Sequence, residues 1–438
     1  MIEFDDRPDS RYAWWRLSIA MALMTIGGCS MYAIVVVLPL VQSDFGISRS
    51  GASLPYTLTM IGFGVGGIFM GRLADRHGVR VPLLLGSVCL GIGFILAAYA
   101  QGLLMFALAQ GVLIGLLGSS ATFGPLLTDI SFFFEKRRGI AVAICAAGNY
   151  LAGTVWPPIV EWAMRSHGWR GTYVGIGVFC LLTMVPLALL MRQRPAVGVA
   201  TQLGAQATTE SVNLSATLSA KPDASSNVNP NASRPVAIAD QERPLGWSAN
   251  FVMALLTVAG VACCVAMSMP QVHIVAYCGD LGYGVARGAQ MLSLMLGFGV
   301  VSRLISGVIS DRIGGLRTLL LGSVLQGIAL LLFLPFDGMA SLYVIAALFG
   351  LFQGGIVPAY AIIVRELFSP AQAGARVGTA LMATLLGMAL GGWMSGKLFD
   401  LTGSYTAAFI NGIAWNLLNI TIVLVLLYRS KRWAKKAT

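Results

Sequence analysis

An eight-residue pattern, bounded by glycines and containing charged residues, occurs once in each half of the sequence. Residues 71–78 read GRLADRHG and residues 307–314 read GVISDRIG. The register holds beyond the pattern, because the same six residues, LLLGSV, follow each copy at 83–88 and 319–324. Each copy lies between two long apolar segments, so the repeat predicts a membrane protein built from two related bundles of helices.

The composition agrees with this interpretation. Of the 438 residues, 57% are hydrophobic and 11% are charged, and the mean hydropathy is +0.78, a balance that soluble domains do not have. Because a helix needs about 20 apolar residues to cross a bilayer, the apolar segments predict twelve spans. The predicted spans are 15–40, 52–74, 80–100, 103–131, 139–162, 172–192, 248–277, 286–309, 317–335, 340–364, 376–399 and 405–428.

A polar segment separates six predicted spans from the other six. Residues 193–247 are rich in Ala, Ser, Thr, Asn and Pro without an apolar period, so we expect a disordered linker that lets the two bundles move against each other. The fold class is therefore all-α and integral to the membrane, with an N-terminal six-helix bundle over 1–192 and a C-terminal six-helix bundle over 248–438.

The net charge of +11 comes from basic residues that favour one side of the membrane. Most of the 29 lysines and arginines lie in the termini, in the linker or in loops that share a side with them. Because basic loops stay in the cytoplasm, we expect both termini to be cytoplasmic, in a multi-pass protein of the plasma membrane such as a bacterial inner membrane. This distribution argues for membrane orientation and against a nucleic-acid partner.

The repeated pattern resembles the G-x-L-a-D-R-x-G signature of the major facilitator superfamily, in which twelve spans form two six-helix bundles. The stretch FFFEKRRG at 132–139 is similar to one in the monocarboxylate and oxalate/formate branch of that superfamily. The resemblance implies secondary active transport by alternating access, with the repeated cluster acting as a latch of the outward-facing state. It assigns the latch to Gly71, Asp75, Arg76, Gly78, Gly307, Asp311, Arg312 and Gly314.

The residue types in the repeat suit such a latch. A carboxylate at Asp75 or Asp311 can meet a helix N-terminus or an arginine. We expect Gly71 and Gly307 to permit close helix approach, and the later glycines of the pattern to permit a tight turn. The alternative is that these charged loops only set the orientation of the chain.

Arg303 lies in an otherwise apolar or small stretch of the eighth predicted span. Eight residues separate it from Asp311, so it is roughly 12 Å from the helix end. An arginine at such a depth costs about 2.5–3.5 kcal/mol or more unless it faces water or an anion. Its counterpart in the first half, 236 positions earlier, is Gly67. We expect Arg303 to bind a substrate carboxylate; a structural ion pair and snorkelling to the interface are the alternatives.

The resemblance supports this role, since monocarboxylate-type carriers have an arginine at this place. Proton-coupled animal carriers of that type also have an aspartate one turn earlier, where this chain has Gly299. Two other groups are therefore candidates for proton coupling. His273 follows Pro270 in the seventh span and is a candidate for substrate or proton binding, or alternatively for packing or gating. Asp129 near the end of the fourth span is the second candidate, or alternatively pairs with a basic residue among 136–138.

Further polar and aromatic side chains on the spans expected to surround a central cavity are candidates for orienting a ligand. Hydrogen bonding between helices is the alternative for each of them. These residues are Tyr32, Asn149, Tyr150, Gln353 and Tyr360.

The sequence therefore predicts a monomeric, proton-coupled transporter, a symporter, of a small monocarboxylate-like organic anion in the lipid bilayer. We expect no catalytic residues, metal or cofactor, since no paired carboxylates, His/Cys cluster or nucleotide-binding motif occurs in the spans. The alternatives are a carrier of a larger aromatic or vitamin-like solute, a drug efflux antiporter and a non-transporting sensor. A membrane enzyme fits least well. Substrate identity and direction are left open.

Overall fold

The computed structural model describes residues 9–191 and 244–437, and these residues form helices joined by turns. Most of the predicted linker, 193–247, lies outside the described residues. The helices of the first half are α1 (Arg11–Gly27), α2 (Cys29–Phe45), α3 (Arg49–His77), α4 (Arg80–Ala98), α5 (Leu103–Leu108), η1 (Ala109–Gly118), η2 (Ser119–Thr122), α6 (Gly124–Phe133) and α7 (Arg138–Leu190). Those of the second half are η3 (Pro244–Gly246), α10 (Ala249–Asp280), α11 (Val285–Ile313), α12 (Gly315–Leu332), α13 (Met339–Gln353), α14 (Ile356–Leu367), α15 (Pro370–Thr402) and α16 (Thr406–Ala437).

Within the described ranges, 11 helices are long and apolar enough to cross a membrane. The predicted span 139–162 and nearly all of the predicted span 172–192 lie in the single helix α7, which has 53 residues and ends at Leu190. Gly168 interrupts α7 with φ 66° and ψ 173°, a backbone conformation that favours glycine.

The chain reverses direction within α7. Gly148 packs on Met24 of α1, while the Sγ atom of Cys180 lies 3.8 Å from that of Cys29 at the start of α2. A straight helix would place residues 148 and 180 roughly 48 Å apart, whereas Met24 and Cys29 are separated by roughly 8 Å of helix. The two arms of α7, before and after Gly168, therefore run in opposite directions along α1 and α2.

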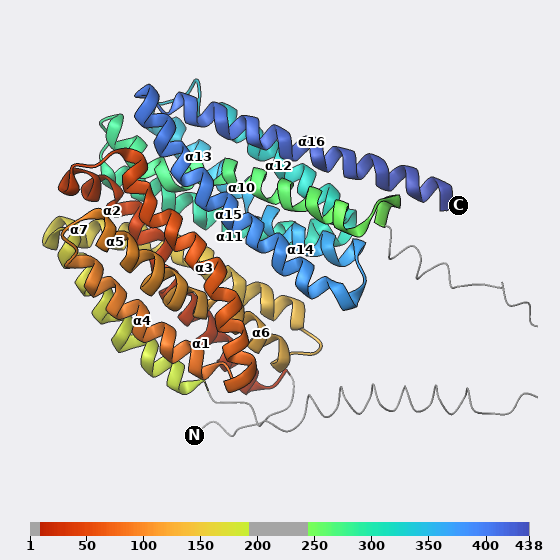
Figure 1. Ribbon diagram of the computed structural model, residues 1–438, viewed down its shortest axis with the longest axis horizontal. Helices are drawn as coiled ribbons and strands as arrows, with labels where there is room; N and C mark the ends of the chain where they lie inside the picture. Colours follow the sequence, from red (N-terminus) through yellow and green to blue (C-terminus); the bar gives the residue numbers. More distant parts are fainter. Residues whose placement is uncertain (1–8, 192–243, 438) are drawn as a thin grey trace, which may run out of the picture.

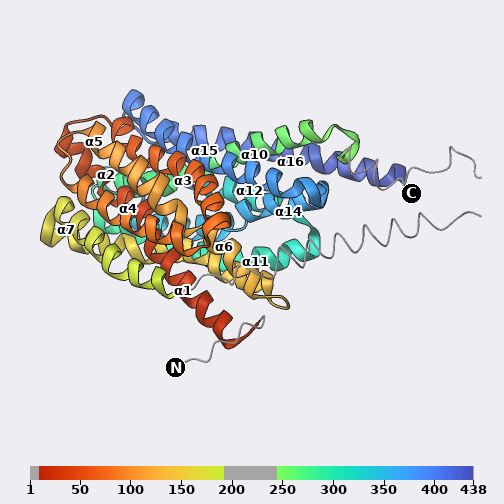
Figure 2. The ribbon, with the colours of Figure 1, turned by 60° about the horizontal axis from the view of Figure 1, so that its bottom comes forward.

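The two halves of the chain lie side by side, the first half in red to yellow-green and the second in green to blue (Figure 1). A view turned by 60° shows the same division (Figure 2). Two pairs of helices form the seams between the halves, α3 with α15 and α7 with α11.

Glycines of the repeated pattern end equivalent helices in the two halves. Gly78 follows α3 with φ 77° and ψ 165°, and Gly314 follows α11 with φ 83° and ψ 164°. A side chain is strained in this conformation, so the tight turn predicted for the pattern is present in both copies. The expectation of close helix approach at Gly71 and Gly307 is wrong, because a Cβ added at either position would meet no atom within 4 Å.

Candidate functional site

A cavity of about 380 Å³ lies between the two halves, midway along the seams. It is lined by residues of α2, α3, η2, α6 and α7 from the first half and of α10, α11, α14 and α15 from the second. Four of the predicted ligand-binding residues line it: Tyr32, Asn149, Tyr150 and Arg303. We call it the Arg303 cavity.

Arg303 reaches across the seam from α11 to α7. Its Nη1 donates a hydrogen bond of 3.1 Å to the carbonyl of Ala146, and its guanidinium carbon lies 4.4 Å from the centre of the Tyr150 ring. Its Nε is buried and has no hydrogen-bond partner in the structure. Among the described residues, no carboxylate lies within ion-pair distance of Arg303. The side chain is thus a cation held by a carbonyl and an aromatic face, with one N–H donor that has no acceptor.

Tyr150 also explains why the position one turn before Arg303 is a glycine. A Cβ at Gly299 would lie 2.5 Å from Cδ1 of Tyr150. The tyrosine ring therefore occupies the space that a larger side chain at Gly299 would need. No carboxylate fits there while Tyr150 keeps this position beneath Arg303.

Gln353 and Tyr360 do not line the Arg303 cavity, so the expectation that they face it is wrong. Tyr360 is fully buried in the second half and donates to Oδ1 of Asn419 at 3.1 Å. Gln353 is fully buried and accepts a 3.1 Å hydrogen bond from Nε2 of Gln271. Gln271 does line the cavity and was missed by the sequence analysis. Its position beside Pro270 in a membrane-spanning helix is the signal that points to it.

His273 lies outside the Arg303 cavity and is fully hydrogen-bonded. Its Nε2 donates to the carbonyl of Gly392 at 2.8 Å, since a carbonyl only accepts. Its Nδ1 lies 3.1 Å from the hydroxyl of Tyr405, which can donate to it. A neutral imidazole satisfies both contacts, an arrangement that favours the packing or gating alternative over direct contact with substrate.

Asp129 forms a two-pronged ion pair with Arg16 inside the first half. Arg16 Nε lies 2.7 Å from Oδ2 and Nη2 lies 3.1 Å from Oδ1, and the two side chains are 1% and 3% exposed. Tyr12 accepts a further bond from Arg16, at 3.0 Å. The ion-pair partner that the sequence analysis sought among residues 136–138 is therefore Arg16, because α1 packs against α6 in the core.

One end of the cavity is closed by a group of polar contacts between the halves, which we call the Arg49 clasp (Arg49, Ser50, Asp280 and Asp400). The carboxylate of Asp400 accepts from the backbone N–H of Arg49 at 2.8 Å and of Ser50 at 2.9 Å. Nη2 of Arg49 donates to both oxygens of Asp280 at 2.9 Å, with its guanidinium 4.8 Å from the Phe399 ring. Sequence analysis missed the clasp; the signal was an aspartate in the last turns of both α10 and α15.

The opposite ends of α3 and α11 carry the repeated pattern. There Asp75, Arg76, Asp311 and Arg312 are exposed. Hydrogen bonds between the halves occur at the clasp and at positions nearer the repeated pattern. Thr57 donates to the carbonyl of Ala389 at 3.1 Å, and Arg303 donates to the carbonyl of Ala146. The structure therefore holds the halves together at the clasp and leaves the charged side chains of the pattern in contact with solvent.

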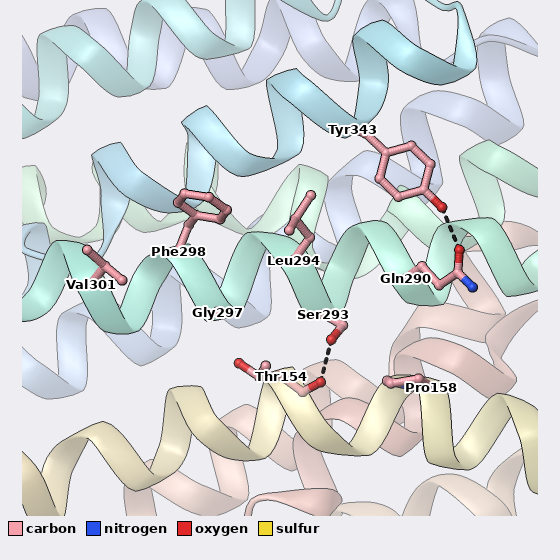
Figure 3. Close-up of a pocket in the computed structure, with 9 residues that line it drawn as sticks. All are labelled: Thr154, Pro158, Gln290, Ser293, Leu294, Gly297, Phe298, Val301 and Tyr343. Carbon is pink, nitrogen blue, oxygen red and sulfur yellow. Dashed lines mark hydrogen bonds between the residues drawn. The ribbon is translucent and has the colours of Figure 1, made fainter.

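A second hollow of about 440 Å³ lies along the seam of α7 and α11 (Figure 3). Ser293 donates to the carbonyl of Thr154 across the seam, and Tyr343 donates to Oε1 of Gln290 at 2.6 Å. None of the described residues that line this hollow is charged. An anion is therefore better matched by the Arg303 cavity. Within the described ranges, no group of three His, Cys, Asp or Glu residues is arranged to hold a metal ion.

Comparison with known proteins adds a family and a fold. The sequence profile of the Major Facilitator Superfamily matches residues 20–339 and 303–438. Monocarboxylate transporter 13 of Rattus norvegicus is 25% identical over 347 residues, which cover 77% of this chain and 71% of that protein. An uncharacterized MFS-type transporter, YcxA of Bacillus subtilis, is 25% identical over 372 residues, 82% of each chain. The crystal structure of a bacterial homolog of the human lysosomal transporter Spinster, inward-facing and unoccupied, has a similar fold, with a TM-score of 0.71 at 14% identity over 98% of both chains.

Proposed function

This chain belongs to the Major Facilitator Superfamily, and we propose that it carries an organic monocarboxylate across the membrane through the Arg303 cavity by alternating access. Family membership makes it a multi-pass membrane transporter and not an enzyme. Similar proteins named monocarboxylate transporters support the choice of substrate class.

The observation that carries the proposal is the state of Arg303. A cation inside a membrane protein is costly unless an anion or water compensates it, and here its nearest partners are a carbonyl and a ring. A substrate carboxylate would supply the missing negative charge and accept hydrogen bonds from the guanidinium where it lines the cavity. We therefore assign substrate binding to Arg303, with Tyr32, Asn149 and Tyr150 as orienting groups.

We also propose that the chain has twelve spans, counting the two arms of α7 separately. They form six-helix bundles over 1–192 and 248–438, joined by the linker at 193–247, with both termini in the cytoplasm. The positive-inside rule supports this orientation, which places the Arg49 clasp on the outer side of the plasma membrane. The structure then corresponds to a state closed outside, with the latch residues disengaged on the inner side.

Proton symport is the proposed energy source, because a monoanion that moves with one proton carries no net charge. Asp129 is poorly placed for this role, since Arg16 neutralises it away from the cavity. His273 is the better candidate because it is connected to the clasp. It contacts the hydroxyl of Tyr405, whose ring centre lies 5.9 Å from the guanidinium of Arg49. We propose that the transporter functions as a monomer.

Uptake by purified protein in liposomes tests the substrate class. Labelled lactate, pyruvate and benzoate are offered to the native chain and to Arg303→Gln, which keeps hydrogen-bond donors but removes the charge. We expect at least a tenfold loss of carboxylate uptake. The matched control is Arg287→Gln, since Arg287 lies exposed at the other end of the same helix. Carboxylate uptake that is equal in both variants would refute the role of Arg303.

A further inference from the structure

We infer that the Arg303 cavity selects monocarboxylates with a bulky, apolar body of about the size of an aromatic ring, in preference to two- or three-carbon acids and to dicarboxylates. The inference rests on the proposed function and narrows its substrate class. Three features of the cavity support it: its charge, its lining and the origin of its width.

Among the described residues that line the cavity, Arg303 alone is charged. One carboxylate would pair with it. The second carboxylate of a diacid would have to leave water without a cationic partner, which is costly in an interior of low polarity. The charge of the lining therefore favours a substrate with one carboxylate.

The rest of the lining is mostly apolar, and much of it is soft. Five methionines from both halves contribute to it, and aromatic rings lie among them. Thioether side chains adapt to irregular apolar shapes and make favourable contacts with rings. The methionines are Met31, Met60, Met267, Met382 and Met388. An acid of two or three carbons has little apolar surface to bury here, whereas a ring would contact this lining on both faces.

The cavity is wide because three helices present glycines to it. Gly67 of α3, Gly124 of α6 and Gly378 of α15 line it, and a Cβ added at any of them would meet no atom within 4 Å. Gly64, also in the lining, differs because a Cβ there would lie 2.7 Å from Sδ of Met382. The first three glycines thus leave open space that a side chain could fill. We assign Gly67, Gly124 and Gly378 as the residues that set the size of the accepted substrate.

Gly67 offers the sharpest test, because it is also the repeat counterpart of Arg303. Gly67→Leu would place an isobutyl group in the cavity, since a Cβ at this position meets no atom within 4 Å. In the native protein we expect benzoate and phenylacetate to compete for uptake at least tenfold better than acetate or lactate, with succinate inactive. Gly67→Leu is expected to weaken competition by the two ring acids at least tenfold while leaving that by acetate and lactate unchanged or improved.

The control is Gly175→Leu, the same exchange at an exposed helical glycine of α7 that also meets no atom within 4 Å and does not line the Arg303 cavity. We expect each acid to compete for uptake by this variant as well as it does for uptake by the native protein. If Gly67→Leu does not fold, Gly378→Leu tests the same space from the second half, and thermal shifts with benzoate and lactate report binding without transport.

The outcomes separate this inference from the proposed function. Arg303-dependent uptake that shows no preference for ring acids overturns the inference and leaves the function standing. An equal loss for all acids in Gly67→Leu and in Gly378→Leu also overturns it. Uptake that does not depend on Arg303 refutes the proposed function itself.

Discussion

Asp400 of the second half accepts a 2.8 Å hydrogen bond from the backbone N–H of Arg49, the first residue of α3 in the first half. The same carboxylate accepts from Ser50 at 2.9 Å. Helix N-termini have unpaired N–H groups and a partial positive charge, so a carboxylate from another helix can cap them. In this molecule, Ser48 caps α3 from its own half, and Asp400 adds a second cap from the opposite half, which requires the two halves to be closed at this end.

Removing that cap is expected to loosen the closed end. Loss of a capping side chain costs about 0.5–2 kcal/mol, so Asp400→Ala should raise the population of structures open at the clasp roughly 2- to 30-fold. Hydrogen exchange of the amides in the first turns of α3 measures this. Asp337→Ala, at an exposed loop aspartate of the second half, is the control. Unchanged protection in Asp400→Ala would show that the cap does not hold the clasp closed.

The side chains of Arg49 and Asp280 should act as a coupled pair. The Arg49 side chain is 7% exposed and that of Asp280 is 39% exposed, so the arginine loses more when its partner is removed. We expect Arg49→Gln and Asp280→Asn each to lower the thermal midpoint. The free energy of unfolding lost by the double variant is expected to be about 0.5–3 kcal/mol less than the sum of the two single losses. A thermal unfolding cycle measures this difference, and strict additivity would contradict the pairing.

The buried pair of Arg16 and Asp129 should serve stability and not proton coupling. Breaking a buried pair leaves one uncompensated charge and costs about 3–5 kcal/mol. Asp129→Asn is therefore expected to lower the thermal midpoint strongly, and Arg16→Met combined with Asp129→Leu to recover much of the loss. Uptake driven by a pH gradient should persist in the double variant. A stable Asp129→Asn protein that no longer responds to the gradient would assign Asp129 to coupling instead.

Gly299 should be intolerant of even one added carbon. A Cβ at this position would lie 2.5 Å from the Tyr150 ring, so Gly299→Ala must displace the ring that lies against Arg303. We expect carboxylate affinity to fall roughly tenfold, which corresponds to about 1.4 kcal/mol. Gly297→Ala is a close control on the same helix, since its Cβ would meet Thr154 at 3.4 Å, an ordinary contact. Equal affinities in the two variants would show that the Tyr150 position is unimportant for binding.

His273 should matter for proton drive more than for substrate binding. His273→Gln removes the group that binds both Tyr405 and Gly392, without altering the lining of the Arg303 cavity. We expect exchange of substrate between equal concentrations to continue while accumulation driven by a pH gradient falls at least fivefold. The two assays are run on the same liposomes. A variant with full gradient-driven accumulation would remove His273 from the coupling mechanism.

Local pattern predicted much of this protein. The repeated glycine-bounded turns are present at Gly78 and Gly314, because a positive φ is a property of the chain at one residue. Arg303 lies at the cavity, since a cation deep in an apolar span needs an anion or water near it. Helix periodicity and span length likewise follow from neighbours a few residues apart in the sequence.

The pairing of distant side chains was decided by the tertiary structure. Arg49 and Asp280 meet across 231 positions, Arg16 and Asp129 across 113, and the second cap of α3, Asp400, lies 351 positions from Arg49. The sequence also could not predict that Tyr360 and Gln353 face the protein core. In a membrane both the lipid and the protein core are apolar, so the sequence of a helix does not distinguish the side that faces one from the side that faces the other. The sequence by itself therefore determined a duplicated helical transporter with one deep cation; packing alone decided which end is closed and how wide the site is.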